Sequence, residues 1–372
     1  MITAETVNAI ALSMLFFNRP ERLRQVYDRV GSASAIVEAA DHLRDLVPDL
    51  NVSAFAIDKA ELQQKIEAAK READFIDKHQ MQCLTPDSPH YPTRLREVCA
   101  DAPIVLYYCG SANLNAPRAI SIVGTRQSTE YGRDMVDNIC AELAAYFPDL
   151  LVVSGLAYGT DINAHRAALA NGLPTVGVLA HGLDRIYPTV HRNTAAKMLT
   201  QGGLITEFPT GTRPDGHNFL RRNRIIAALS EATLVIESKF KGGSLYTAQL
   251  ALDYGLTVMA CPGRATDACS EGCNNLINSS SAAMLTSAAD VVRALGWQVK
   301  KPKLQDLPTL FDLNLSGEER IIYDCLDAEG VHTNTVIERS QLPIPRVMAV
   351  LSELEFRGVV RQLPGSKWRK LQ

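Results

Sequence analysis

The sequence lacks an excess of basic residues, the usual mark of a protein that attracts nucleic acid by overall charge. Its 372 residues include 38 lysines and arginines against 41 aspartates and glutamates, so the formal net charge is −3. The molecule as a whole therefore offers no positive field to a polyanion. Any polyanion site must be a local patch.

Signals for secretion, membrane insertion and zinc binding are also missing. The apolar stretch 10–17 follows Glu5, has no basic leader and is too short to span a bilayer, so we expect a core helix. Eight cysteines are spread thinly along the chain, which together with the missing secretory signal indicates reduced thiols and a cytoplasmic location. No membrane association is expected. Cys269 and Cys273 have no second pair at zinc spacing, so no metal is expected.

Familiar catalytic and cofactor motifs are absent. The chain has no nucleophile elbow, no Walker A loop and no His-Glu-x-x-His motif. Residues 124–129 follow a predicted strand but contain one glycine, and no acidic residue stands where a dinucleotide ribose would be held. We therefore expect no catalytic residues and no cofactor.

The hydrophobic pattern divides the chain into a helical part, an α/β part and a second small unit. Residues 1–79 have helical spacing and predict a small SAM-like or helix-hairpin-helix-like domain. The hairpin glycines are replaced by residues 17–20, so we expect this domain to be a scaffold. Residues 80–297 alternate short apolar runs with helical patterns, which predicts a Rossmann-like parallel sheet covered on both faces.

The last part of the chain predicts a linker and a winged helix. Residues 298–314 carry lysine, proline and aspartate and are interpreted as a linker. Within 315–372 three helical patterns precede a hairpin broken at residues 364–366. Ser316 and Glu319 fit a capping box at the first of these helices.

Two turns combine bare backbone amides with a cation. Gly124, Thr125 and Arg126 follow the apolar run 119–123, and Lys241, Gly243 and Ser244 follow the run 232–236. The carboxyl end of a parallel strand that opens into a helix is where α/β sheets bind ligands, and a helix N-terminus attracts anions. Phosphate binding is the first hypothesis, and the alternative for Arg126 is a surface ion pair with Glu130.

A third turn, residues 154–161, has the same strand-to-helix form. Ser154 and Gly155 could donate hydrogen bonds to a phosphate, and Asp161 is expected to cap the following helix. His165 lies one turn further along the same helix face. We interpret it as a packed, hydrogen-bonded histidine rather than a catalytic base.

The densest basic stretch is residues 219–224. Phe219 could offer a stacking surface for a base, and Arg222, Asn223 and Arg224 follow it at the start of a helix. The arginines could bind phosphate or could pair with Glu207 and Glu237, which are expected to end adjacent strands. For these two glutamates we favour such a clamp over acid–base chemistry.

Five ordered motifs between about Pro103 and Val292 resemble the DNA-processing protein A family, also called Smf. They are Ile122-Val123-Gly124-Thr125-Arg126, the residues Ser154-Gly155-Leu156-Ala157 with Gly159, Asp161, Ala164 and His165, Arg222-Asn223-Arg224-Ile225-Ile226, Gly243-Ser244-Leu245 with Thr247 and Ala248, and Pro262-Gly263 with Gly272, Asn274, Asn275, Leu276 and Ile277.

The resemblance implies an extended Rossmann-like fold and a recombination mediator without enzymatic activity. Such a protein binds single-stranded DNA, protects incoming strands in natural transformation, loads the RecA recombinase and acts as a homodimer through the Rossmann-like domain. The motifs and the resemblance together predict a DNA-binding set of Gly124, Thr125, Arg126, Ser154, Gly155, Phe219, Arg222, Asn223, Arg224, Lys241, Gly243 and Ser244.

Two other functions compete with this one. Nucleotide phosphoribohydrolases carry a similar glycine-rich turn followed by a catalytic glutamate, but residues 247–249 offer no acid here. A winged helix also suits a transcription regulator. Its long helix, 344–357, carries Arg346 and Arg357, and the wing is more basic with Arg361, Lys367, Arg369 and Lys370.

Overall fold

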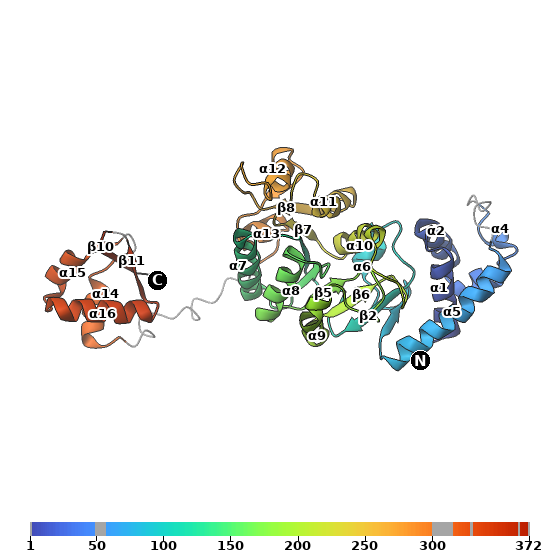
Figure 1. The fold of residues 1–372 in the computed structure, drawn as a ribbon, viewed down its shortest axis with the longest axis horizontal. Coiled ribbons are helices and arrows are strands. Elements are labelled where there is room, and N and C mark those ends of the chain that lie inside the picture. The colour runs from blue at the N-terminus through green and yellow to red at the C-terminus, as the bar shows by residue number, and fades with distance from the viewer. Residues whose placement is uncertain (1, 49–56, 300–314, 328–329, 364, 371–372) are drawn as a thin grey trace. The chain divides into compact units, whose positions relative to one another are not determined.

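A central sheet of mostly parallel strands dominates the larger of two units in the computed structural model (Figure 1). The structure describes residues 2–48, 57–299, 315–327, 330–363 and 365–370. The sheet order within them is β1-β2-β6-β5-β4-β3-β7-β8-β9. The strands are β1 (Gln82–Leu84), β2 (Leu106–Gly110), β3 (Ala119–Val123), β4 (Leu151–Ser154), β5 (Thr175–Val178), β6 (Gly203–Thr206), β7 (Ala232–Val235), β8 (Thr257–Ala260) and β9 (Ala283–Met284).

Strands β3 to β9 pair in parallel, as the alternating pattern predicts. The exception is one edge, where β2 runs antiparallel to β6 and β1 runs antiparallel to β2. An antiparallel edge on an otherwise parallel sheet is common in α/β folds. The fold class expected from the sequence is confirmed, with this edge as an addition.

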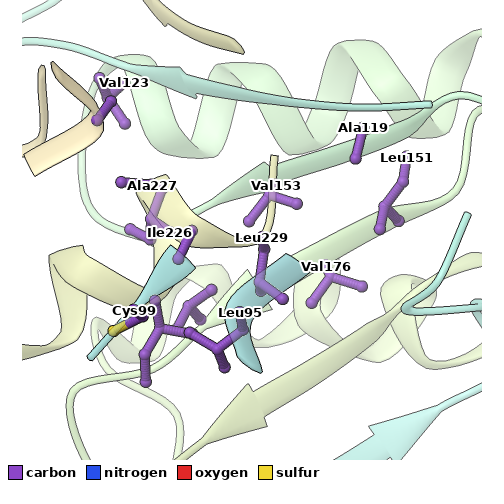
Figure 2. Close-up of a cluster of buried hydrophobic side chains, with 14 of the residues drawn as sticks. Leu95, Cys99, Ala119, Val123, Leu151, Val153, Val176, Ile226, Ala227 and Leu229 are labelled. Carbon is purple, nitrogen blue, oxygen red and sulfur yellow. The ribbon is translucent and has the colours of Figure 1, made fainter. Parts of the chain in front are cut away.

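Helices cover both faces of the sheet because the strands are apolar on both sides. Ala119 and Val123 of β3 enter one hydrophobic cluster (Figure 2). Ile120 and Ile122 enter the other, as the two-residue strand period requires. The first cluster includes side chains from α6, α10 and α11, and the second includes side chains from α7, α8 and α13. The helices of this part are α6 (Thr93–Val98), α7 (Glu130–Tyr146), α8 (Thr160–Ala170), α9 (Arg192–Gln201), α10 (Gly216–Ala228), α11 (Gly243–Asp253), α12 (Glu271–Asn278) and α13 (Ala288–Ala294).

The amino-terminal helices pack against the antiparallel edge of the sheet. They are α1 (Ala4–Leu15), α2 (Pro20–Val30), α3 (Ala33–Glu38), α4 (Leu43–Leu46) and α5 (Lys59–Lys78). Their apolar side chains share one cluster with Ile104, Val105 and Tyr107. The boundary between residues 79 and 80 stays a prediction, since segments on both sides of it contribute to this cluster.

Two polar contacts fasten these helices to the segment around the start of α10. The carboxylate of Glu72 on α5 accepts hydrogen bonds from the amide nitrogen of Thr210, at 2.9 Å, and from its hydroxyl. The carbonyl of Phe17 accepts a hydrogen bond from Arg221 on α10. The helical part therefore holds both the loop before α10 and the helix itself.

The smaller unit is a winged helix. It contains α14 (Gly317–Asp324), β10 (Val331–His332), α15 (Thr333–Ser340), α16 (Ile344–Phe356), β11 (Val360–Leu363) and β12 (Lys367–Lys370). Ser316 and Glu319 form the predicted capping box, and Trp368 is buried in the core. The three helices and the hairpin are confirmed, and β10 adds a third strand. Residues 300–314, most of the predicted linker, lie outside the described residues.

The order of the strands reverses at β3. From β3 the chain moves outward through β4, β5 and β6, then returns to the other side of β3 with β7 and continues to β9. The loop after β3 leads to α7 on one face, and the loop after β7 leads to α11 on the other. Loops that diverge in this way leave a crevice at the carboxyl edge, where α/β proteins of this kind bind ligands.

Candidate nucleic-acid interface

A pocket of about 460 Å³ occupies this crevice. The loops after β3, β4 and β7 and the first turns of α10 and α11 line it. Of the twelve residues in the predicted DNA-binding set, nine are at the pocket: Gly124, Thr125, Arg126, Phe219, Arg222, Asn223, Lys241, Gly243 and Ser244. The structure does not place the other three, Ser154, Gly155 and Arg224, in its lining.

Arg126 is an exposed cation at the pocket rim. Its guanidinium carbon lies 5.4 Å from the centroid of the Phe219 ring, a cation–π distance. Among the described residues no carboxylate forms an ion pair with Arg126, so the pairing with Glu130 weighed as its alternative is not seen. The charge remains available to a ligand.

The loops around the pocket are tied to one another through their backbones. The amide of Thr125 donates to the carbonyl of Glu237 at 2.7 Å, and the amide of Thr160 donates to the carbonyl of Thr125 at 3.1 Å. Gly159 has a φ of 76°, and a β-carbon there would overlap the Thr125 carbonyl oxygen. The turns after β3, β4 and β7 therefore form one rigid rim.

The first turn of α11 forms the opposite wall. Gly242 is its N-cap and has no side chain to bond the first amides, and Gly242, Gly243 and Ser244 all line the pocket. Lys241 is exposed beside them, and so is Lys239, which belongs to none of the sequence motifs. The Ser244 hydroxyl donates to Ser238 at 2.9 Å. Amides and two ammonium groups make this wall suited to an anion.

Arg222 forms part of the pocket wall and is also hydrogen-bonded to the backbone of the protein. It is 3% exposed, and one of its terminal nitrogens donates to the carbonyl of Gly155, at 2.6 Å, and to that of Val178. Burial lowers its pKa to about 10, and the Asp161 carboxylate opposes that shift. Arg222 therefore fixes the turn after β4 through this nitrogen, while its Nε donates to Asn223 at 3.2 Å. The DNA contact expected of Arg222 stays a prediction.

Ser154 and Gly155 lie behind this arginine. The Ser154 hydroxyl is fully buried and donates to the carbonyl of Ile122 at 2.6 Å. A β-carbon on Gly155 would collide with the Arg222 guanidinium. Ser154 shapes the turn through its hydroxyl bond, and Gly155 does so by allowing Arg222 to approach its backbone. The phosphate contacts expected of them stay predictions.

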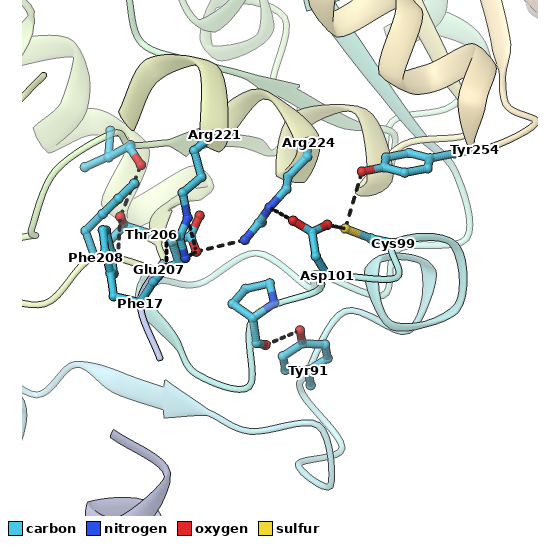
Figure 3. A network of polar contacts seen from close by, with 12 residues as sticks. Phe17, Tyr91, Cys99, Asp101, Thr206, Glu207, Phe208, Arg221, Arg224 and Tyr254 are labelled. Atoms are coloured by element: carbon cyan, nitrogen blue, oxygen red, sulfur yellow. Dashed lines mark hydrogen bonds and ion pairs between the residues drawn. The ribbon is translucent and has the colours of Figure 1, made fainter. Parts of the chain in front are cut away.

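Arg224 joins a buried ion-pair network on the other side of α10 (Figure 3). Glu207 accepts from Arg221 at 2.6 Å and from Arg224 at 2.8 Å, and Asp101 lies 2.8 Å from Arg224 Nε. Burial lowers the pKa of Arg224, but Glu207 and Asp101 outweigh burial and raise it. The clamp considered from the sequence is therefore confirmed for Glu207 with Arg224, and Arg221 joins it. Among the described residues neither Arg222 nor Glu237 forms an ion pair.

The expectation that Glu207 and Glu237 end adjacent strands is wrong. Strands β6 and β7 are separated by β5, β4 and β3, because the chain crosses back over β3 before forming β7. Glu237 instead accepts hydrogen bonds from the amide of Thr129, at 2.9 Å, and from its hydroxyl, at 2.6 Å. It thereby organises the loop that leads into α7.

The residues of the third turn also have structural roles. Gly159, not Asp161, is the N-cap of α8, so the capping role expected of Asp161 is wrong. The Asp161 carboxylate accepts from the amide of Ala157 at 3.3 Å. His165 is fully buried with Nδ1 2.7 Å from the Thr175 hydroxyl, and burial lowers its pKa to about 3. The prediction of a packed histidine is confirmed.

Two exposed aromatic side chains near the pocket were not predicted from the sequence. Tyr158 lies in the pocket lining and is 48% exposed, and Tyr187 is 45% exposed with its ring 6.0 Å from that of Phe219. Tyr158 lies inside the motif of residues 154–165, so its place near the pocket could have been predicted from the sequence. Tyr187 stands outside every motif, and only the fold brings it to Phe219.

The fold and the crevice define an extended Rossmann-like protein with a pocket at the carboxyl edge of its sheet, joined to a winged helix. Residues 82–296 match the family model for DNA recombination-mediator protein A, and residues 308–366 match that of the DprA winged helix domain. The chain belongs to the DNA recombination-mediator protein A family, as its motifs predicted. This membership gives it a role in DNA processing as a recombination mediator.

Relatives and solved structures agree with this assignment. Protein Smf of Escherichia coli K12 is 34% identical over 288 residues, which cover 76% of this chain and 75% of the relative. DNA processing protein A from Streptococcus pneumoniae has a similar fold, with a TM-score of 0.62 and 27% identity over 76% of this chain and 97% of that chain. The protein from Helicobacter pylori, solved for its single-stranded DNA binding mode, has a TM-score of 0.52 and 28% identity over 58% of this chain and 95% of that chain.

Membrane spans and metal clusters are both missing from the part of the chain that the structure describes. It contains no helix long and apolar enough to cross a membrane. The same residues contain no group of three or more histidine, cysteine, aspartate or glutamate side chains that could hold a metal ion.

Proposed function

We propose that this protein binds single-stranded DNA in the crevice at the carboxyl edge of the sheet. The observation that carries the proposal is the convergence of Arg126, Lys241, Phe219 and the uncapped start of α11 on one pocket. In a chain with net charge −3, such a local collection of donors and cations is the patch that a polyanion would require. The Helicobacter pylori relative, described for its single-stranded DNA binding, supports the same assignment.

The pocket would hold the strand by its phosphates and by its unpaired bases. Backbone amides of α11 and the charges of Arg126 and Lys241 would bind phosphates, which carry no sequence information. Phe219 would stack a base, and any base can stack. Duplex DNA would bind poorly because its bases are already stacked inside the helix and cannot reach that ring.

The cellular role that we propose follows from such a groove. A strand held in it is shielded, as incoming DNA in natural transformation must be, and can be passed to the RecA recombinase. We further propose a homodimer through the Rossmann-like domain, a cytoplasmic location, and binding without catalysis or a cofactor.

Neither competing function gains support from the site. Of the residues that line the pocket, Asp161 alone carries a carboxylate, and it is buried and bonded to the Ala157 amide. A phosphoribohydrolase would need an accessible acid. In the winged helix, Arg346 of α16 lies 2.6 Å from Glu318 and Arg357, the C-cap of α16, lies 2.9 Å from Glu319, so a carboxylate offsets each of these two arginines.

Fluorescence anisotropy with a labelled single strand and a matched duplex tests the proposal. We expect the single strand to bind more tightly and Arg126→Glu to weaken it strongly. Lys70→Glu is the matched control, because Lys70 is an exposed cation on α5. Equal affinity for duplex and single strand, or wild-type affinity in Arg126→Glu, would contradict the proposal.

A further inference from the structure

Beside the pocket, the half-buried ring of Phe219 lies next to the exposed ring of Tyr187. Tyr187 lies 6.0 Å from Phe219 between centroids, and the two ring planes are tilted by 53°. Tyr187 is 45% exposed, and its hydroxyl makes no hydrogen bond to any other described residue. An aromatic ring with this exposure, beside a phosphate-binding pocket, is available to a flat apolar ligand.

The two rings are held in place by bonds between their loops. The amide of Gly182 donates to the carbonyl of Thr212 at 3.3 Å, and the amide of Gly211 donates to Asp184 at 3.1 Å. The segment that carries Tyr187 is thus fastened to the segment that leads into α10 and Phe219. A surface fixed before binding costs less entropy to occupy than one that must order.

We propose that Tyr187 is a second base-stacking subsite, which takes the nucleobase next to the one stacked on Phe219. This inference rests on the proposed function, since it requires single-stranded DNA in the crevice. The tilt between the rings rules out one base sandwiched between two parallel faces. Each ring instead presents a face to its own base, while Arg126, also beside Phe219, binds the backbone.

The proposal predicts a size for the effect. Stacking contributes about 1–3 kcal/mol per base, which at 1.4 kcal/mol per factor of ten corresponds to roughly 5- to 140-fold in affinity. Tyr187→Ala should therefore weaken single-strand binding at least five-fold. Tyr187→Phe keeps the ring and should bind like wild type. Tyr187→Leu keeps apolar bulk without the ring and should bind like Tyr187→Ala.

An abasic scan of the oligonucleotide separates stacking from a general structural role. The probe is the shortest labelled oligodeoxythymidine that keeps full affinity. With a longer strand, the DNA could shift along the groove and place an intact base at the subsite; with the shortest strand, such a shift would leave part of the groove without phosphates. One position at a time lacks its base. In wild-type protein we expect a loss of affinity at two neighbouring positions. Tyr187→Ala should abolish the loss at one of them, and Phe219→Ala should abolish it at the other.

Tyr146→Ala provides the matched control. Tyr146 is 44% exposed and is the last residue of α7, the helix that leads from the carboxyl end of β3 to the amino end of β4; no residue of α7 lines the pocket. This variant should keep the wild-type affinity and the wild-type abasic profile. Thermal unfolding of every variant confirms that each one is folded at the assay temperature.

The outcomes keep this inference distinct from the proposed function. If wild-type protein prefers single strands but Tyr187→Ala keeps both its affinity and its abasic profile, the Tyr187 subsite is overturned and the function stands. The subsite is also overturned if Tyr187→Leu binds as well as Tyr187→Phe. If wild-type protein shows no preference for single strands, the function itself fails.

Discussion

Arginines on the two sides of α10 have opposite uses. On the pocket side, Arg126 from the loop after β3 is exposed beside Phe219 of α10. On the other side, Arg221 and Arg224, three positions apart and hence on one helix face, share the buried carboxylate of Glu207 (Figure 3). The comparison teaches that a run of arginines is not by itself a binding patch. What matters is whether each charge has already found a partner inside the protein.

The largest effect should come from Glu207→Gln. This change leaves Arg221 and Arg224 with no carboxylate at that site, and removing one partner of a buried ion pair costs about 3–5 kcal/mol in the free energy of unfolding. Chemical denaturation measures it. The control is Glu67→Gln, which removes the exposed pair with Lys70 and should cost a few tenths of a kcal/mol. If both variants lost the same free energy of unfolding, the buried ion pairs of Glu207 would contribute no more to stability than the exposed pair of Glu67.

A smaller effect should appear as a dependence of stability on pH. The folded pKa of His165, about 3, lies below the ordinary histidine value, because burial disfavours the charged ring. Between about pH 6.5 and pH 3 the unfolded chain binds a proton that the folded chain does not, so stability falls as pH falls. At about pH 5 the loss is about 2 kcal/mol relative to neutral pH.

His165→Asn isolates this contribution, because asparagine can hydrogen-bond to Thr175 but does not titrate. Unfolding free energies at about pH 7.5 and about pH 5 should differ less in the variant than in the wild type. The same pH sensitivity in both proteins would show that His165 is protonated without difficulty in the fold.

The smallest effect on stability should come from Arg126→Ala. Because Arg126 is exposed and has no carboxylate partner among the described residues, the free energy of unfolding should change by less than about 0.5 kcal/mol. Affinity for single-stranded DNA should fall, and its salt dependence should become shallower by about 0.7 for each phosphate that the variant no longer neutralises. Arg224→Lys should do the reverse, lowering stability while leaving the salt slope unchanged. The same change of slope in both variants would erase the distinction between the two sides of α10.

Most helices and strands could be predicted from the sequence, because their hydrophobic periodicity and caps depend on residues that are close together in the chain. The apolar runs 119–123 and 232–236 became the parallel strands β3 and β7, and the capping box expected at Ser316 and Glu319 begins α14. The parallel sheet expected over residues 80–297 did not include the antiparallel strand β2. Its direction depends on a long-range pairing with β6, which no local pattern encodes.

The pocket was predictable to the extent that backbone motifs define it. Turns that follow parallel strands placed Gly124, Arg126, Lys241 and Gly243 at one edge. The fates of the charged side chains were harder to predict, because a partner such as Asp101 is more than a hundred residues away from Arg224. Tyr187 was missed for the same reason, since its contact with Phe219 exists only in three dimensions.

The bond between Glu72 and Thr210 has a practical consequence for anyone who trims this protein. A fragment beginning at residue 80 would lack that carboxylate and the Phe17 carbonyl. It would also expose the apolar side chains of Ile104, Val105 and Tyr107 to water. Such a fragment should be less stable and more prone to aggregation than the full chain. The amino-terminal helices therefore stabilise the segment and the helix that form one wall of the proposed DNA-binding pocket.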